Sequence, residues 1–363
     1  MLVHPSQLVP GCLVVSDVMG KTNRPIIPKN TALDEQTIQF LRKFLVEKVE
    51  VSSRLSYGAP FIPKEVLPED SDKKETEKAV QPEEPKTFED LYFQSVREFK
   101  KLFEGWQSSQ SIDINKLRKF VLPLFEKIDD VGDQLYKIHQ YSNKQDYFYH
   151  HAVATGILSA YLSRQMGYQK EWIQIGIAGF LADCGMARID EDLIGKQGTF
   201  TDRDLKEMQN HPTFSYRLVE KIASLSMGVK LAVLQHHERL DGSGYPLKVD
   251  KSKIHPYATI IAVCDMYHAM TSERVHQPKQ SPFLVIERMH REQFGKLDHE
   301  ALRALMKCLT SFSIGTKVRL SNQQIGEIVF LEESTPTRPM VRVNGEIITL
   351  KKDLNLYMEE ILT

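Results

Sequence analysis

The chain has 363 residues, a formal net charge of -1, and 41% hydrophobic and 26% charged residues. This length allows two or three domains, and the near-zero charge gives no electrostatic case for binding a nucleic-acid polymer. No apolar run is long enough to cross a membrane and no signal peptide is evident, so we expect a cytoplasmic protein without a membrane partner. The four cysteines are widely spaced without a Cys-x-x-Cys pair, which favours reduced thiols over a disulfide framework.

The first predicted unit, residues 1–60, is a small α/β or β-rich module. Short apolar segments alternate there with turn signals, and an amphipathic stretch over 34–48 predicts one helix. Residues 61–87 are predicted to be an acidic, proline-containing linker. Between Lys64 and Thr87 there are eight acidic residues and five lysines but no aromatic residue. Such a segment buries too little apolar surface to offset the entropy lost on ordering.

Residues 88–311 carry the helical part of the chain. Apolar residues recur with helical spacing over 88–103 and over 114–128, where Pro123 predicts a kink. Further predicted helices cover 153–166, 172–181 and 258–270. The first two helices either extend the helical domain or form the face of a homodimer, and the sequence leaves both readings open.

After residue 312 the pattern changes to short alternating runs, and Asn344-Gly345 is a strong signal for a type I′ hairpin turn. We therefore predict a small β unit over 312–363. The expected fold class is mainly α: a helical bundle with a small N-terminal α/β or β-rich module and a small C-terminal β unit.

Two adjacent imidazoles, His236 and His237, follow an apolar helical run and precede a glycine-rich loop. Successive helical residues diverge by about 100°, so both rings reach one metal cluster only if the helix ends at this point. Further imidazoles and carboxylates follow one another at intervals of about one helix and one loop: His151, Asp183, His211 and Asp265. The last of these interrupts an apolar helix, where an unpartnered carboxylate is costly.

Imidazoles and carboxylates together suit Fe, Mn, Zn or Ni. Six such side chains exceed what one ion needs, so one or two divalent transition metals per chain are expected. In the two-metal reading, Asp183 is shared between ions about 4 Å apart, which activate water for attack on phosphorus.

The eleven residues from His236 to Pro246 resemble the signature loop of the HD-GYP family, a subgroup of the metal-dependent HD phosphohydrolases that hydrolyses cyclic di-GMP. The resemblance extends over about 131–310, with landmarks in the family's order at 146–153, 196–201, 211–212, 261–267 and 271–274. It implies a helical HD-type bundle, a divalent metal, and cyclic di-GMP or a related nucleotide as ligand.

The resemblance also implies roles for individual residues. His151, Asp183 and Asp265 match the ligands of one metal. Asp183, His211, His236 and His237 match the ligands of the other metal. Because Asp183 belongs to both sets, it is the expected catalytic residue. Arg274 and Tyr245 match positions near the bound nucleotide. The GYP loop, Gly244, Tyr245 and Pro246, is expected to shape the cavity wall and to present a surface to a protein partner.

Four positions depart from the family's pattern. Ala182 stands where the family's His-Asp doublet has its histidine, and Met186 replaces a lysine that helps to hold the substrate phosphate. Gln277 replaces a basic residue, and Tyr147 stands where members with a third metal carry a glutamate. Losing a ligand weakens a metal site, and losing a cation removes stabilisation of the charge that develops on phosphorus.

Three functions follow from these residues. The first is a degenerate HD-GYP module that binds metal, and cyclic di-GMP or a partner, with weak or no hydrolysis. The second is an active metal-dependent cyclic di-GMP phosphodiesterase. The third is a purely structural or interaction scaffold. The six retained imidazoles and carboxylates count against the scaffold, whereas Ala182, Met186 and Gln277 count against the active enzyme, so the sequence leaves the enzymatic status open.

Overall fold

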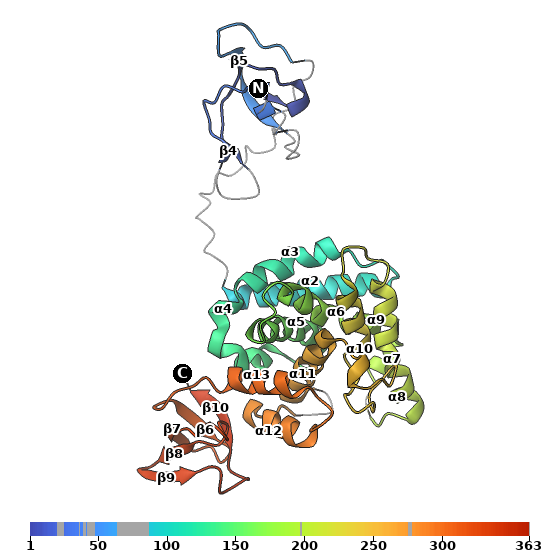
Figure 1. Cartoon of the computed structure of the whole chain (residues 1–363), viewed down its shortest axis with the longest axis vertical. Helices are drawn as coiled ribbons and strands as arrows, with labels where there is room; N and C mark the ends of the chain where they lie inside the picture. The colour runs from blue at the N-terminus through green and yellow to red at the C-terminus, as the bar shows by residue number, and fades with distance from the viewer. Residues whose placement is uncertain are drawn as a thin grey trace. The chain divides into compact units, whose positions relative to one another are not determined.

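The computed structural model describes residues 1–19, 25–35, 37–38, 41, 48–63, 87–196, 198–274 and 278–362. Contacts divide the chain into two compact units, Met1–Glu84 and Pro85–Thr363 (Figure 1). Gln277, most of the helix predicted over 34–48, and residues 64–86 of the predicted linker lie outside the described residues. Among the described residues, no helix is both long and apolar enough to cross a membrane.

The first unit is built from short antiparallel strands and a 3-10 turn. These elements are β1 (Leu2–Val3), η1 (Pro5–Gln7), β2 (Cys12–Val14), β3 (Val18–Met19), β4 (Pro25–Ile27) and β5 (Val49–Leu55). One sheet has the order β1-β5-β2, and β3 pairs with β4 in a second. Val49, Val51 and Leu55 of β5 point into an apolar core, as the period of two along a strand requires.

The second unit is a bundle of helices followed by a five-stranded sheet (Figure 1). Its first helices are α2 (Phe88–Gln107), α3 (Ile114–Glu126), α4 (Ile128–Val131), α5 (Tyr147–Gln165) and α6 (Trp172–Leu181). These are followed by α7 (Glu191–Ile194), α8 (Asp202–Met208), α9 (His211–Val219), α10 (Met227–Gln235), α11 (Pro256–Thr271), α12 (Pro282–Glu292) and α13 (His299–Leu309). The 3-10 segments are η2 (Gly132–Tyr141), η3 (Cys184–Arg188) and η4 (Lys251–Lys253). The mainly helical fold class expected from the sequence is confirmed.

Local sequence signals explain where these helices begin and end. Thr87 caps α2 in a capping box with Asp90, which satisfies backbone N–H groups that the first turn leaves without partners. Pro123 lies inside α3, and the helix continues past the proline to Glu126. Lys127 then connects α3 to α4. Gly167, with φ of +93°, follows the end of α5 in the left-handed region that favours glycine.

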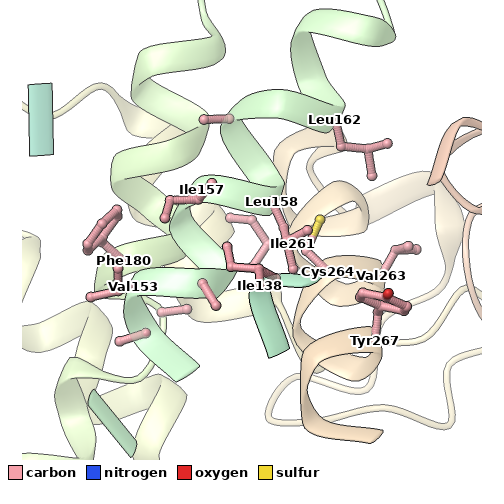
Figure 2. Close-up of a cluster of buried hydrophobic side chains, with 14 of the residues drawn as sticks. Ile138, Val153, Ile157, Leu158, Leu162, Phe180, Ile261, Val263, Cys264 and Tyr267 are labelled. Atoms are coloured by element: carbon pink, nitrogen blue, oxygen red, sulfur yellow. The ribbon is translucent and has the colours of Figure 1, made fainter. Parts of the chain in front are cut away.

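The core of the bundle forms where α5, α6 and α11 meet. Figure 2 shows Leu158 of α5 beside Ile261 and Cys264 of α11, all of them in one buried cluster. A Cβ at Gly179 of α6 would lie 2.9 Å from the carbonyl oxygen of Thr155 in α5, so the absence of a side chain allows this close approach. The crossing fixes the end of α6 against the first half of α5.

The sheet that follows the helices has the order β10-β6-β7-β8-β9. Its strands are β6 (Lys317–Leu320), β7 (Ile325–Phe330), β8 (Met340–Val343), β9 (Glu346–Thr349) and β10 (Met358–Leu362). Asn344 and Gly345 have φ of 51° and 89°, as a type I′ turn between β8 and β9 requires. The sequence did not predict β10, which pairs antiparallel with β6. Contacts place this sheet in the same compact unit as the helices.

Candidate metal centre

Imidazoles and carboxylates from five parts of the helical unit converge at one place. Their positions are His151 in α5, Asp183 after α6, His211 at the start of α9, His236 and His237 after α10, and Asp265 within α11. They form two groups that share Asp183: Asp183, His211, His236 and His237 in one, and His151, Asp183 and Asp265 in the other. Within each group the potential ligand atoms lie within 4.8 Å of one another.

Asp183 faces both groups with different oxygens. Its Oδ1 lies 3.1 Å from Nε2 of His211 and 3.3 Å from Nε2 of His236. Its Oδ2 lies 3.6 Å from Nε2 of His151, and that nitrogen is 2.8 Å from Oδ1 of Asp265. The carboxylate of Asp183 therefore has the geometry of a ligand shared between two positions.

Backbone carbonyls fix the orientation of two of the rings. Nδ1 of His211 lies 2.7 Å from the oxygen of Met208, and Nδ1 of His236 lies 2.8 Å from the oxygen of Val233. A carbonyl oxygen only accepts hydrogen bonds, so each Nδ1 carries a proton and each neutral ring keeps its Nε2 lone pair. The two Nε2 atoms lie 3.4 Å apart, and both face Oδ1 of Asp183. Three acceptors without a donor between them suit a cation.

Burial and charge act in opposite directions on the carboxylates. Burial alone would raise the pKa of Asp183, but the contacts of its carboxylate with the imidazoles of His211 and His236 hold that pKa well below its usual range. Burial likewise opposes ionisation of Asp265, and its hydrogen bond with His151 outweighs burial and lowers its pKa. Both carboxylates are therefore ionised at neutral pH and present negative charge to the centre.

The imidazoles respond to the same surroundings. Burial lowers the pKa of His237 well below its usual value, and the neighbouring His236 lowers it further. Burial would also lower the pKa of His151, but the hydrogen bond to Asp265 raises it above the ordinary value. A neutral His237 keeps a lone pair on one ring nitrogen, which is available to bind a metal.

The glycine-rich loop packs against His237. The ring of Tyr245 stacks on that of His237 with 4.7 Å between centroids, and a Cβ at Gly244 would lie 2.5 Å from the carbonyl oxygen of His237. The peptide between Tyr245 and Pro246 is cis. The buried Glu238 closes the loop by accepting hydrogen bonds from the backbone N–H groups of residues 247–249. The loop thus forms one wall of the centre.

The departures from the family's pattern lie close by. Ala182 and Met186 are buried in the apolar core on either side of Asp183. The Tyr147 ring stacks on that of His151 at 5.3 Å, and the guanidinium of Arg274 lies 5.7 Å from the Tyr147 centroid. Arg274 is therefore held at the edge of the His151 group.

Two residues of the centre were missed from the sequence. His268 lies fully buried with its Nδ1 2.9 Å from Nδ1 of His151, and burial lowers its pKa well below the usual value. The sequence did carry a signal for His268, because it lies one helical turn after Asp265 on the same face of α11. Glu238, next to His237, gave no signal beyond its membership of the loop.

The donor set fits a divalent transition metal. One group offers three imidazoles and a carboxylate, and the other offers one imidazole and two carboxylates, which matches the preferences of Fe, Mn, Zn and Ni. The geometry does not choose between these ions. Residues His211, His236, His237 and Asp183 would hold one ion, and His151, Asp183 and Asp265 would hold the other.

Comparisons with known proteins find similar sequences over the helical part of the chain. The family described as HD domain matches residues 138–300. The chain is 28% identical over 243 residues to the cyclic di-GMP phosphodiesterase PA4108 of Pseudomonas aeruginosa, covering 67% of this chain and 58% of that protein. It is 25% identical over 202 residues to the cyclic di-GMP phosphodiesterase PdeB of Borreliella burgdorferi, covering 54% and 53%. The chain thus spans less than two thirds of the length of these relatives.

A solved structure shares the fold. Bd1817, an HDG"Y"P protein from Bdellovibrio bacteriovorus, superposes with a TM-score of 0.52 at 13% identity, over 86% of this chain and 99% of that one. The family match, the relatives and the shared helical fold agree with the loop at residues 236–246. The chain is thus similar to HD-domain proteins over residues 138–300 and shares the helical fold of Bd1817.

Proposed function

We propose that this chain is a degenerate HD-GYP signalling protein that binds one or two divalent transition metals and cyclic di-GMP, with weak or no hydrolysis. The proposal takes the ligand from the relatives, which are cyclic di-GMP phosphodiesterases. An interaction with a protein partner through the GYP loop, a homodimer and a cytoplasmic location stay predictions of the sequence. So does the four-part division at residues 60, 87 and 311.

The observation that carries metal binding is the position of Asp183 between two groups of imidazoles and carboxylates. A scaffold would gain nothing from burying four imidazoles against two carboxylates, since each such group costs desolvation unless it is paired or bound to a metal. The retention of the whole set argues against a purely structural role.

When bound, divalent metals at such a site polarise a phosphoryl oxygen and lower the pKa of water. The chain's own residues would orient the ligand. Arg274, at the edge of the centre, is placed to face a phosphate, and Tyr245 forms part of the wall. The ionised Asp183 would contribute to holding both ions.

The observation that argues for weak hydrolysis is the apolar character of two residues near Asp183 in the sequence, Ala182 and Met186. Ala182 offers no ligand atom and Met186 offers no charge, and both side chains are buried. Losing one electrostatic contact to a transition state typically costs about 3 kcal/mol, or about a hundredfold in rate. The intact ligand groups favour the active phosphodiesterase as the second candidate function.

The test compares hydrolysis of cyclic di-GMP by the wild type and by an Ala182→His, Met186→Lys double variant, each loaded with Mn²⁺ or Fe²⁺. We expect the wild type to bind the nucleotide with very slow hydrolysis. The double variant should hydrolyse it faster by about two orders of magnitude or more, because both contributions act on the transition state.

The result that would refute degeneracy is brisk wild-type hydrolysis that His237→Ala abolishes, which would establish the active phosphodiesterase instead. A wild type that binds neither metal nor nucleotide, together with no gain in hydrolysis by the double variant, would leave the structural scaffold as the remaining function. Binding is measured separately from turnover, by isothermal titration calorimetry with the non-hydrolysable phosphorothioate analogue.

A further inference from the structure

His268 occupies an unusual place beside the metal centre. It is fully buried on α11, and its ring lies 5.1 Å from that of His151 and 6.3 Å from that of Tyr147. Nδ1 of His268 lies 2.9 Å from Nδ1 of His151, and its Nε2 lies 3.2 Å from Oγ of Ser272. A chain of contacts therefore runs from Asp265 through His151 and His268 to Ser272.

The direction of these hydrogen bonds follows from the role of His151. Its Nε2 faces Oδ1 of Asp265 and Oδ2 of Asp183, so Nε2 is the atom that would bind a metal, and it must carry a lone pair. The single proton of the neutral ring then sits on Nδ1 and needs an acceptor. The nearest is Nδ1 of His268, at 2.9 Å, whereas the Tyr147 hydroxyl lies at 3.3 Å.

One consequence follows for His268 itself. If its Nδ1 accepts, its own proton must be on Nε2, which can donate to Oγ of Ser272. Both rings are then neutral, and each has one tautomer. The positions of the two protons are therefore fixed by Oγ of Ser272 at one end and by the metal-facing Nε2 of His151 at the other.

We propose that His268 is a positioning residue that fixes the tautomer and orientation of His151 for metal binding, by accepting a hydrogen bond from the Nδ1–H group of His151. This inference rests on the proposed metal function. The usual partner of a ligating imidazole is a carboxylate, a carbonyl or water. His211 and His236 follow that rule with backbone carbonyls, and His151 departs from it.

The position formed by His151, Asp183 and Asp265 is consequently the weaker of the two. It has three protein ligands against four, and its imidazole lacks the added basicity that a carboxylate partner would supply. An acceptor at residue 268 sets how well this position holds its ion, while His211 and His236 in the other group have backbone carbonyls as their acceptors.

The test is a Zn²⁺ titration of the metal-free full-length protein, with two binding events expected in the wild type. His268→Leu removes the acceptor and should weaken the second event by about 10- to 100-fold. His268→Asn places an amide oxygen near the position of Nδ1 and should restore most of that affinity. Tyr147→Phe removes the competing hydroxyl but keeps the stacked ring, so it should leave both events close to wild type.

A spectroscopic measurement makes the test independent of any loss of folding in the leucine variant. Long-range ¹H–¹⁵N correlation of the Zn²⁺-loaded wild type should show His151 protonated on Nδ1 and His268 on Nε2. Tyr267→Phe, on the same helix, is the control for general damage, because the hydroxyl of Tyr267 has no hydrogen-bond partner among the described residues.

The outcomes separate the two proposals. A wild type that binds no Zn²⁺ overturns the metal function and this inference with it. Two wild-type events that His268→Leu leaves unchanged, a loss of affinity in Tyr147→Phe instead, or a His268 proton on Nδ1 overturns only the role of His268. A single wild-type event that His151→Ala does not alter does the same.

Discussion

The side chain of His236 is completely buried and has one ring nitrogen committed to the backbone. Its other nitrogen can therefore serve only the centre, where it lies 3.3 Å from Oδ1 of Asp183. This makes His236 the residue whose loss best reports on metal binding, since no exposed alternative geometry is open to it.

We expect the purified wild type to retain about one transition metal per chain after mild dialysis, in the four-ligand group, and His236→Ala to retain almost none. Elemental analysis measures both. His290→Ala, which removes an exposed imidazole from α12, is the matched control and should keep the metal. A wild type that retains as little metal as His236→Ala would contradict the prediction.

At the scale of elements, Arg338 ties the C-terminal sheet to the helices. Its guanidinium forms two hydrogen bonds, of 2.8 and 2.7 Å, with the carboxylate of Glu287 in α12. It also donates to the carbonyl oxygen of Leu356, just before β10. The Arg338 side chain is only 7% exposed, so this pair is largely withdrawn from water and cannot be replaced by solvent.

Arg338→Met should lower the free energy of unfolding by about 3 kcal/mol or more, because it leaves the carboxylate of Glu287 without its buried partner. Equilibrium denaturation in urea measures the change. Arg291→Met serves as the control and should lower the free energy of unfolding far less, since Arg291 and Glu292 form an exposed pair that water screens. Equal losses in the two variants would show that Arg338 does not hold the sheet.

At the scale of the whole molecule, the composition of residues 64–87 predicts a tether between the two compact units. We expect limited trypsin digestion to cut first in this segment, which contains five lysines, and to yield two stable fragments. Mass spectrometry of the early products locates the cuts. First cleavage elsewhere, with all five of these lysines protected, would mean that the segment packs on a domain or a partner.

Much of the fold could be predicted because helices and hairpins leave local signals. The apolar run at 172–181 is α6 residue for residue, and Asn344-Gly345 forms the expected turn. Strand β10 was missed because its sequence, Met358–Leu362, carries two adjacent glutamates and no alternation. Its pairing with β6 depends on residues about 40 positions away, which no local pattern records.

The centre was predictable in its membership and not in its detail. The residue types and their order along the chain suggested a metal centre, and the resemblance to the HD-GYP family implied two groups sharing Asp183. The hydrogen-bond acceptor for His151 depends instead on how α5 packs against α11, which brings Nδ1 of His268 to 2.9 Å from Nδ1 of His151. Spacing along one helix could suggest His268, but it could not say which ring nitrogen it faces.

The division of Asp183 between two sets of neighbours has a thermodynamic consequence. In the proposed function, Asp183 would help to hold both ions, so occupancy of one position would change the affinity of the other. By linkage, that effect is equal in both directions. The two positions therefore cannot be tuned separately at Asp183: a single carboxylate couples them, and any substitution there alters both affinities and the cooperativity between them.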